Sequence, residues 1–168
     1  MTPVNGLLTN DCDYAPVVWS MIAMAKLIRI VYCSRNCVVG SRAEVEIQIR
    51  NILAVARTRN REAHLTGALA FNEECFAQVL EGSPAEIRPV FDRIRRDTRH
   101  RDVKILSETQ ASRRFFPQWS MAYVDTSDGD GRHPLSHFSF EAALINGAAP
   151  EAAKLLNALR RIIVLGSQ

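Results

Sequence analysis

The segment Cys75–Gly82, with the sequence CFAQVLEG, has the hydrophobic pattern of a strand that is covered on both sides. Side chains alternate between the two faces of a strand. Ala77 and Val79 therefore share one face, and both are apolar. Phe76 and Leu80 share the other face and are apolar as well. Such a pattern is typical of a strand in the interior of a sheet with both faces buried.

One polar residue interrupts this pattern. Gln78 lies on the same face as Phe76 and Leu80. A buried amide without a hydrogen-bond partner costs roughly 1–3 kcal/mol, so we interpret Gln78 as a residue that is kept for its chemistry. The alternative is an exposed edge strand, where a solvent-facing glutamine needs no function. Because the opposite face is also apolar, the functional interpretation is favoured.

Further segments are rich in β-branched, aromatic or other apolar residues and predict additional strands. They are Leu27–Cys33, Thr66–Phe71, Val103–Leu106 and Trp119–Val124. The short polar connection Asn72–Glu74 lies between two of the predicted strands. It predicts a tight hairpin that places these two strands side by side.

Two capping boxes predict the starts of helices. Ser41 and Glu44 form the first, and apolar residues at helical spacing extend this helix over about residues 42–58. Ser83 and Glu86 form the second, with Pro84 at the first helical position.

The predicted elements follow the order β-α-β-β-α-β with one more strand, which is the ferredoxin-like arrangement of an α+β protein. Its two helices can cover only one face of the sheet. The segment Phe138–Leu165 has apolar residues at helical spacing and is predicted to cover the other face. A break at Asn146–Pro150 divides this segment into two short helices, with Gly147 expected to cap the first and Pro150 to begin the second.

The chain is predicted to consist of an extension, one domain and a helical segment. Residues 1–24 show no sustained hydrophobic period and are expected to be a poorly ordered N-terminal extension. Residues 25–125 form the main domain. A linker rich in Asp, Gly and Ser leads to the C-terminal helical segment, residues 135–166.

Composition narrows the class of protein. With 168 residues, of which 47% are hydrophobic, the chain has the length and the apolar content for one packed domain. The net charge of +3, from 21 basic and 18 acidic residues, is too small to indicate nucleic-acid binding by itself.

The cysteines indicate neither a metal site nor a disulfide framework. They are Cys12, Cys33, Cys37 and Cys75, with no CxxC spacing and no histidines at metal-ligand spacing. We therefore expect reduced thiols and a cytoplasmic protein. The apolar stretch at residues 16–25 is shorter than the ~20 residues that a membrane span needs, and no basic region precedes it. Neither a membrane span nor a signal peptide is predicted.

Several polar residues are predicted to converge between the two main helices. Tyr32 and Gln78 lie on the helix-covered faces of their strands. Asn60 is expected just after the end of the first helix. Arg93 and Asp97, four residues apart, are expected on one side of the second helix.

A cleft with apolar walls and a few amide, phenol and guanidinium groups suits a flat heteroaromatic ligand with carbonyls and ring nitrogens. Asn and Gln side chains offer both donors and an acceptor, which match an imide edge. A flavin has these features. The basic segment Arg93–Arg101 is suited to the phosphates of such a ligand. A solvated helix end, with cations near the C-terminal dipole, explains these arginines equally well.

The chain from about Leu27 to Val124 resembles the BLUF domain, the blue-light sensor that uses FAD, in a short single-domain form. The resemblance rests on separated motifs in the right order. They are IVYCSR (30–35), RNREAHLTGAL (59–69), FAQVLEG (76–82), RDTRH (96–100) and WSM (119–121).

The resemblance implies a photochemical mechanism. Tyr32 would donate an electron and a proton to the excited flavin. Gln78 would bridge Tyr32 and the N5/C4=O edge of the flavin, and a change of its rotamer or tautomer would shift the absorption to the red. Trp119 and Met121 match a pair on the last strand that is expected to relay the signal. The alternative for each of them is a large apolar residue that fills a core.

The resemblance also implies which residues hold FAD. Asn60 would hold the carbonyl edge of the flavin. Arg93 and Asp97 match positions that contact the ring and its side chain. Arg99 and His100 match the end of a motif that lies near the ribityl and phosphate part.

The expected protein is a sensor and not an enzyme, because the sequence shows no combination of nucleophile, acid and base at plausible positions. Its output is expected to pass to a protein partner in trans or through a homo-oligomer, without a membrane or direct nucleic-acid contact. A ferredoxin-like nucleic-acid-binding module is the alternative, although it would need exposed aromatic residues on its central strands. A small ferredoxin-like enzyme is a further alternative.

Overall fold

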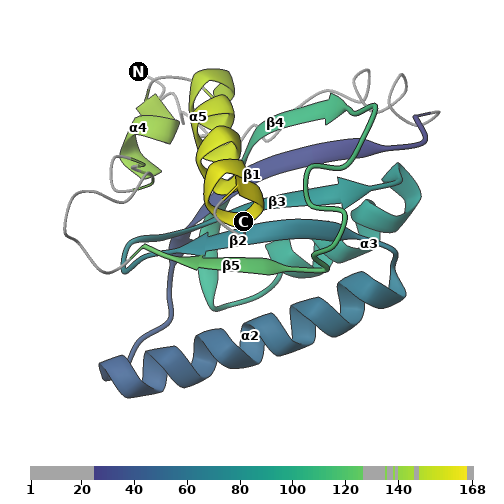
Figure 1. Ribbon diagram of the computed structural model, residues 1–168. Coiled ribbons are helices and arrows are strands. Elements are labelled where there is room, and N and C mark those ends of the chain that lie inside the picture. Colours follow the sequence, from purple (N-terminus) through teal and green to yellow (C-terminus); the bar gives the residue numbers. More distant parts are fainter. Residues whose placement is uncertain (1–24, 127–134, 136–137, 139, 146–147, 166–168) are drawn as a thin grey trace, which may run out of the picture.

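The computed structural model describes residues 25–126, 135, 138, 140–145 and 148–165 (Figure 1). They contain a five-stranded sheet with the order β4-β1-β3-β2-β5. The strands are β1 (Ile28–Asn36), β2 (Thr66–Phe71), β3 (Cys75–Gly82), β4 (His100–Gln110) and β5 (Ala122–Asp125). Hydrogen-bonded neighbours are antiparallel, except that β5 runs parallel to β2. This order confirms the predicted α+β, ferredoxin-like fold with an extra strand.

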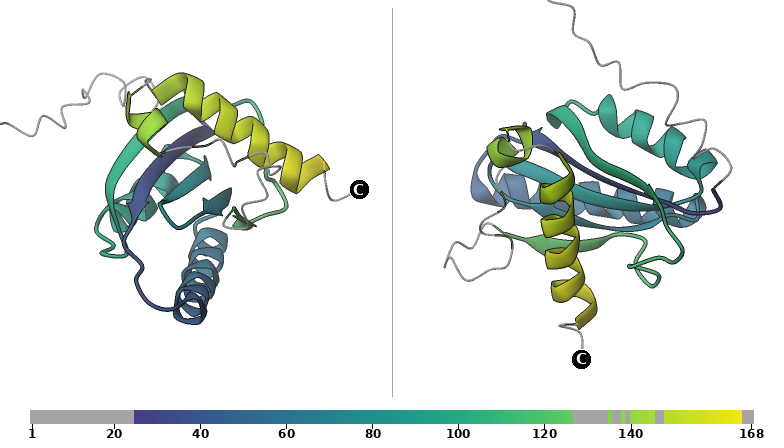
Figure 2. Two further views of the ribbon diagram at one scale, coloured as in Figure 1. Left: turned by 90° about the vertical axis from the view of Figure 1, so that its left-hand side faces the viewer. Right: turned by 90° about the horizontal axis from the view of Figure 1, so that it is seen from above.

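Helices cover both faces of the sheet, as Figures 1 and 2 show. They are α2 (Arg42–Glu62), α3 (Pro84–Arg95), α4 (Phe140–Ile145), α5 (Ala148–Arg160) and a π-helical turn, η1 (Arg161–Leu165). Both predicted capping boxes are present, with Ser41 paired to Glu44 at the start of α2 and Ser83 paired to Glu86 at the start of α3. The helices α2 and α3 pack on one face, and α5 crosses the opposite face. No helix in the described ranges is long and apolar enough to cross a membrane.

The sheet separates two hydrophobic cores, and β3 contributes to both. Ala77 and Val79 belong to the core under α5, together with Leu155 and Leu159 of that helix. Every residue of β3 is buried. The prediction of a strand covered on both faces is therefore confirmed.

A buried carboxylate fixes the connection between β4 and β5 onto the sheet. Glu81 of β3 is fully buried and accepts a hydrogen bond from Arg29 Nε of β1 at 2.8 Å. It also accepts hydrogen bonds from the backbone N–H groups of Phe115 and Phe116, at 2.8 and 3.0 Å. The guanidinium of Arg29 stacks 3.6 Å from the centroid of the Phe115 ring, and that of Arg160 lies 4.9 Å from it. The same ring therefore links the sheet to α5.

Several predicted boundaries are wrong. The helix α2 continues to Glu62, so Asn60 lies inside it and not after its end. Its side chain donates a hydrogen bond to Ser120 O, a tertiary contact that supports the last turn. The helix α3 ends at Arg95, so Asp97 follows the helix.

The strands and the C-terminal helix also differ from prediction. The strand β4 is longer than expected because its polar ends, His100–Arg101 and Ser107–Gln110, also pair with β1. The strand β5 begins at Ala122, so Trp119 and Met121 precede the last strand. The helix α5 begins at Ala148, with Pro150 in its first turn, where a missing N–H is tolerated. The expected cap at Gly147 lies outside the described residues.

Candidate functional site

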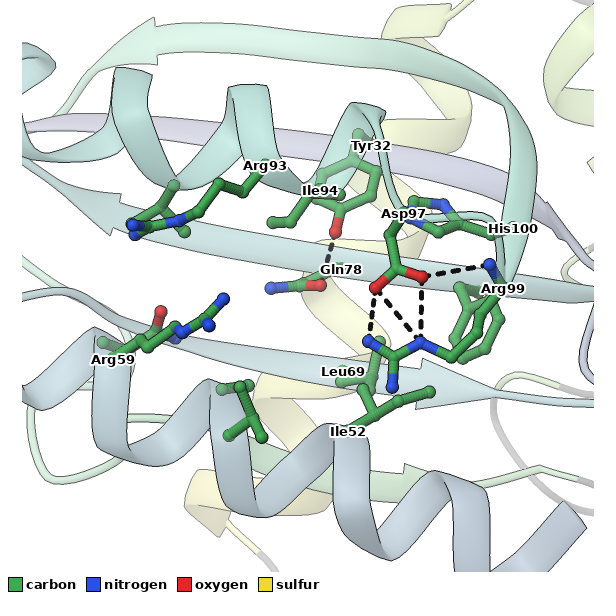
Figure 3. Close-up of a pocket in the computed structure, with 15 residues that line it drawn as sticks. Tyr32, Ile52, Arg59, Leu69, Gln78, Arg93, Ile94, Asp97, Arg99 and His100 are labelled. Carbon is green, nitrogen blue, oxygen red and sulfur yellow. Dashed lines mark hydrogen bonds and ion pairs between the residues drawn. The ribbon is translucent and has the colours of Figure 1, made fainter.

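A cavity of about 120 Å³ lies between α2, α3 and the sheet (Figure 3). Much of its wall is apolar and comes from Ile52, Val55, Leu69, Phe76, Val90 and Ile94. The polar residues that sequence analysis selected for photochemistry or cofactor binding also line it. They are Tyr32, Asn60, Gln78, Arg93, Asp97, Arg99 and His100. The fold thus gathers side chains from β1, β3, both helices and the start of β4 around one space.

Tyr32 and Gln78 form a hydrogen-bonded pair at the floor of this cavity. They lie directly opposite each other in the β1–β3 ladder, so their side chains share a face. Tyr32 Oη donates to Gln78 Oε1 at 2.5 Å. The Phe91 ring contacts Tyr32 edge to face, with 5.2 Å between ring centroids. Burial, with a smaller contribution from the charge of Asp97, raises the pKa of Tyr32 far above its usual value. Tyr32 therefore keeps its proton and donates it.

The amide of Gln78 has a donor to spare. Its Oε1 atom is used by Tyr32, and Figure 3 shows its Nε2 atom directed into the cavity. Within the described residues, Gln78 Oε1 accepts a hydrogen bond, whereas Gln78 Nε2 has no partner. A ligand carbonyl or ring nitrogen in the cavity can accept from this N–H group.

The far end of the cavity is occupied by an ion pair. Asp97 accepts hydrogen bonds from the backbone N–H of Arg99 at 3.0 Å and from its Nε at 2.9 Å, and it also pairs with Nη2. The hydrogen bonds from Arg99 lower the pKa of Asp97. His100 Nδ1 lies 2.8 Å from Ser34 Oγ, and burial lowers the pKa of His100 below its usual value. Arg99 is therefore largely neutralised by Asp97.

The segment before β5 is attached to α2. Asn60 Nδ2 donates to Ser120 O at 2.8 Å, and Arg57 Nε donates to Met121 O at 3.0 Å. Met121 is buried in the core on the cavity side, whereas Trp119 is 41% exposed. Neither Trp119 nor Met121 lines the cavity. Asn60, which lines the cavity, contacts Ser120 between them, and Met121 also packs in one core cluster with the lining residues Tyr32 and Leu69.

Arg59 lines the cavity although sequence analysis gave it no role. A signal for it was present in the sequence. Ile52, Val55, Ala56 and Arg59 recur at the three- and four-residue spacing of one helix face. Arg59 belongs to that stripe because α2 continues beyond residue 58.

The family profile described as "BLUF: Sensors of blue-light using FAD" matches residues 27–122 of the chain. The chain belongs to the BLUF family. The resemblance inferred from the separated motifs is thereby confirmed, as is the assignment of FAD as the cofactor of the family.

Curated relatives share this BLUF region. A 69-residue stretch is 33% identical to the blue light- and temperature-regulated antirepressor BluF of Escherichia coli (strain K12), covering 40% of this chain and 17% of the relative. A stretch of 78 residues is 32% identical to the photoactivated adenylate cyclase subunit alpha of Euglena gracilis, covering 46% of this chain and 7% of the relative. The chain thus spans less than a fifth of the length of these relatives.

Solved BLUF structures match a larger share of this chain. The dark-state structure of BlrB, a BLUF protein, has a TM-score of 0.65 and 26% identity over 83% of this chain and 99% of that chain. The ground state of BlsA has a TM-score of 0.65 and 25% identity over 80% of this chain and 87% of that chain. These likenesses agree with the ferredoxin-like sheet and the positions of its helices.

The residues of the cavity fit the isoalloxazine part of FAD. Apolar side chains from two helices and the sheet suit a flat ring system. The Gln78 Nε2 donor aimed into the cavity suits a ring carbonyl or nitrogen. Arginines at the opening suit electron-rich groups of the cofactor.

Proposed function

We propose that this BLUF chain senses blue light through FAD held between α2 and α3, with Tyr32 and Gln78 as the responding pair. The observation that carries the proposal is their hydrogen bond of 2.5 Å, which leaves Gln78 Nε2 directed into the cavity. One amide thus contacts the phenol and faces the space where a ring would lie. Asn60, Arg93, Asp97, Arg99 and His100 are proposed to hold the cofactor around this pair.

When bound, FAD would supply the absorption of blue light and an excited state that can accept an electron and a proton. Tyr32 is the proposed donor of both and regains both, so that the chain undergoes no net oxidation. While the Oη proton is away, the bond that fixes Gln78 Oε1 is lost. The Gln78 amide would then be free to settle in a second rotamer or tautomer, in which it would donate a stronger hydrogen bond to the flavin carbonyl. The lasting change is therefore a rearranged hydrogen bond and a red-shifted absorption.

The proposed signal leaves the cavity through Asn60. Its bond to Ser120 O holds the segment between Trp119 and Met121, so a shift of Asn60 moves both residues. The names of the relatives, a light-regulated antirepressor and a photoactivated cyclase subunit, describe proteins in which light controls another activity. By analogy, we propose that this chain is itself no enzyme and signals to a protein partner in trans or to a second copy of itself.

We also propose that the protein is cytoplasmic and does not bind nucleic acid directly. The free thiols of Cys33, Cys37 and Cys75 support a cytoplasmic location. In the described part of the chain, helices cover both faces of the sheet. The open sheet on which RNA bases stack in ferredoxin-like modules is thus covered, and we do not propose direct nucleic-acid binding.

The Tyr32→Phe variant tests the proposal. It keeps the ring and removes the hydroxyl, so we expect bound flavin with a normal dark spectrum and no red-shifted state after blue light. Absorption spectra before and after illumination measure this. Tyr123→Phe is the matched control, because Tyr123 lies on the same side of the sheet without lining the cavity. A normal photocycle in Tyr32→Phe would show that Tyr32 only packs.

A further inference from the structure

Two guanidinium groups face the cavity without a partner of opposite charge. Arg59 of α2 and Arg93 of α3 both line it. Within the described ranges, neither side chain takes part in an ion pair or a hydrogen bond. Figure 3 shows both groups in the gap between the helices, on the side of Gln78 away from Arg99 and His100.

The remaining charges of the lining do not compensate these two cations. Among the described lining residues, Asp97 is the only carboxylate, and it is paired with Arg99. Burial lowers the pKa of His100, so this side chain is neutral near pH 7. Two like charges at one end of the cavity repel each other until a ligand brings electron density between them. The arrangement therefore favours an electron-rich group at this end of the cavity.

We propose that Arg59 and Arg93 raise the reduction potential of the bound flavin by placing two positive charges at the pyrimidine end of its ring. The inference rests on the proposed function, which places the N5/C4=O edge at Gln78. Asn60, the neighbour of Arg59, would then be at the carbonyl edge, and the two guanidinium groups would face the N1 and C2=O end of the ring. Negative charge collects at that end when the flavin is reduced, so both cations stabilise the reduced form more than the oxidised form.

Position and exposure set the size of the effect. Both arginines are solvent-exposed at the opening, which screens part of their field. The bound ring would exclude water from the space between the two guanidinium groups, and this would restore part of their electrostatic field. We expect each substitution to glutamine to lower the ratio of reduced to oxidised flavin, at a fixed potential, about tenfold. For a two-electron couple this corresponds to about 30 mV.

The test measures the potential of bound FAD in the dark, by equilibration with a redox dye of known potential, in the parent, Arg59→Gln, Arg93→Gln and Arg59→Lys proteins. We expect lower potentials in the two glutamine variants and a potential near that of the parent in Arg59→Lys, which keeps the charge. Arg61→Gln is the matched control, since it removes the same charge from α2 at a position that does not line the cavity. We expect no shift in this control.

Two outcomes overturn the inference: equal potentials in the parent and both glutamine variants, or a shift in Arg61→Gln as large as that in Arg59→Gln. A parallel measurement separates this failure from failure of the proposed function. If the parent binds FAD and shows the light-induced red shift while its potential does not respond to Arg59 and Arg93, only the tuning role is lost. If the parent shows no red shift, the proposed function itself fails.

Discussion

Two cross-strand side-chain pairs in the β1–β3 ladder differ in charge and in the number of their hydrogen-bond partners. Arg29 faces Glu81 and Tyr32 faces Gln78, each pair directly opposite in the antiparallel register. Because the pairs are three residues apart along each strand, they point to opposite faces of the sheet. The charged pair lies on the face under α5, and the neutral pair lies on the cavity face. One backbone register thus carries a charged pair on one face of the sheet and, on the other face, the neutral pair that we propose as the light-responsive switch.

The pairs differ in how fully their hydrogen bonds are satisfied. The Glu81 carboxylate accepts from Arg29, from two backbone N–H groups and, at 3.3 Å, from Thr66 Oγ1. A fully buried charge requires such a set of partners, because an unpaired one is strongly destabilising. The neutral Gln78 amide tolerates incomplete pairing at a much smaller cost. A fixed carboxylate therefore anchors the loop, while an amide with a spare donor is able to reorient.

The largest expected effect comes from Glu81→Gln. The substitution leaves the Arg29 charge buried without its partner, and we expect the free energy of unfolding to fall by about 3 kcal/mol. Urea denaturation of the dark protein measures the loss. Glu74→Gln is the control, because Glu74 is exposed in the β2–β3 hairpin and should change stability by less than about 0.5 kcal/mol.

The photochemistry of Glu81→Gln tests whether the two pairs act independently. Glu81 does not line the cavity, so the folded fraction of Glu81→Gln should still show the light-induced red shift. A loss of stability well below 1 kcal/mol would contradict the anchoring role. Loss of the red shift in folded protein would instead show that the two pairs are coupled.

Gln78→Leu should lose the red shift at a smaller loss of stability, the reverse of what is expected for Glu81→Gln. The leucine substitution leaves the buried Tyr32 hydroxyl without its acceptor but adds apolar surface, so we expect the free energy of unfolding to fall by about 1–2 kcal/mol, less than in Glu81→Gln. The red shift should disappear, because leucine cannot exchange hydrogen bonds between Tyr32 and the flavin. Denaturation curves and dark and illuminated spectra of one preparation provide both measurements. A persisting shift would exclude the amide as the switching group.

His100, at the cavity, should make a small contribution to the pH dependence of stability. Burial lowers the pKa of His100 in the folded state, while the unfolded chain has the usual value of about 6.5. Below this value the unfolded chain binds a proton that folded His100 does not, so stability should fall as the pH falls from about 6.5 toward the folded-state pKa. Above it, both states are neutral and His100 contributes no pH dependence.

Thermal unfolding at pH 7.5 and pH 5.5, in the parent and in His100→Gln, measures this contribution. The difference between the two pH values should be smaller in His100→Gln. An identical difference in both proteins would assign the acid sensitivity to other groups. Asp97, whose pKa is lowered by Arg99, would contribute only at a lower pH, below the ordinary value of a carboxylate.

Local sequence patterns were sufficient to predict most of the helices and strands and the inward position of Tyr32 and Gln78. Both capping boxes, the two-sided pattern of β3 and the face shared by Gln78 and Phe76 depend on residues close together in the chain. Such local patterns follow from the periods of helix and strand and need no knowledge of the rest of the fold. The same logic placed a helical cover, now seen as α5, on the second face.

The pairing of the polar groups, in contrast, depends on contacts between segments that are far apart in the chain. Glu81 is buried because its partners arrive from Arg29 and from a loop 34 residues further along the chain, which no local pattern reveals. The last turn of α2 places Arg59 at the cavity and is supported by the contact of Asn60 with Ser120, 60 residues away. Hydrogen-bond satisfaction depends on which distant segments meet, and chain position alone does not specify that meeting.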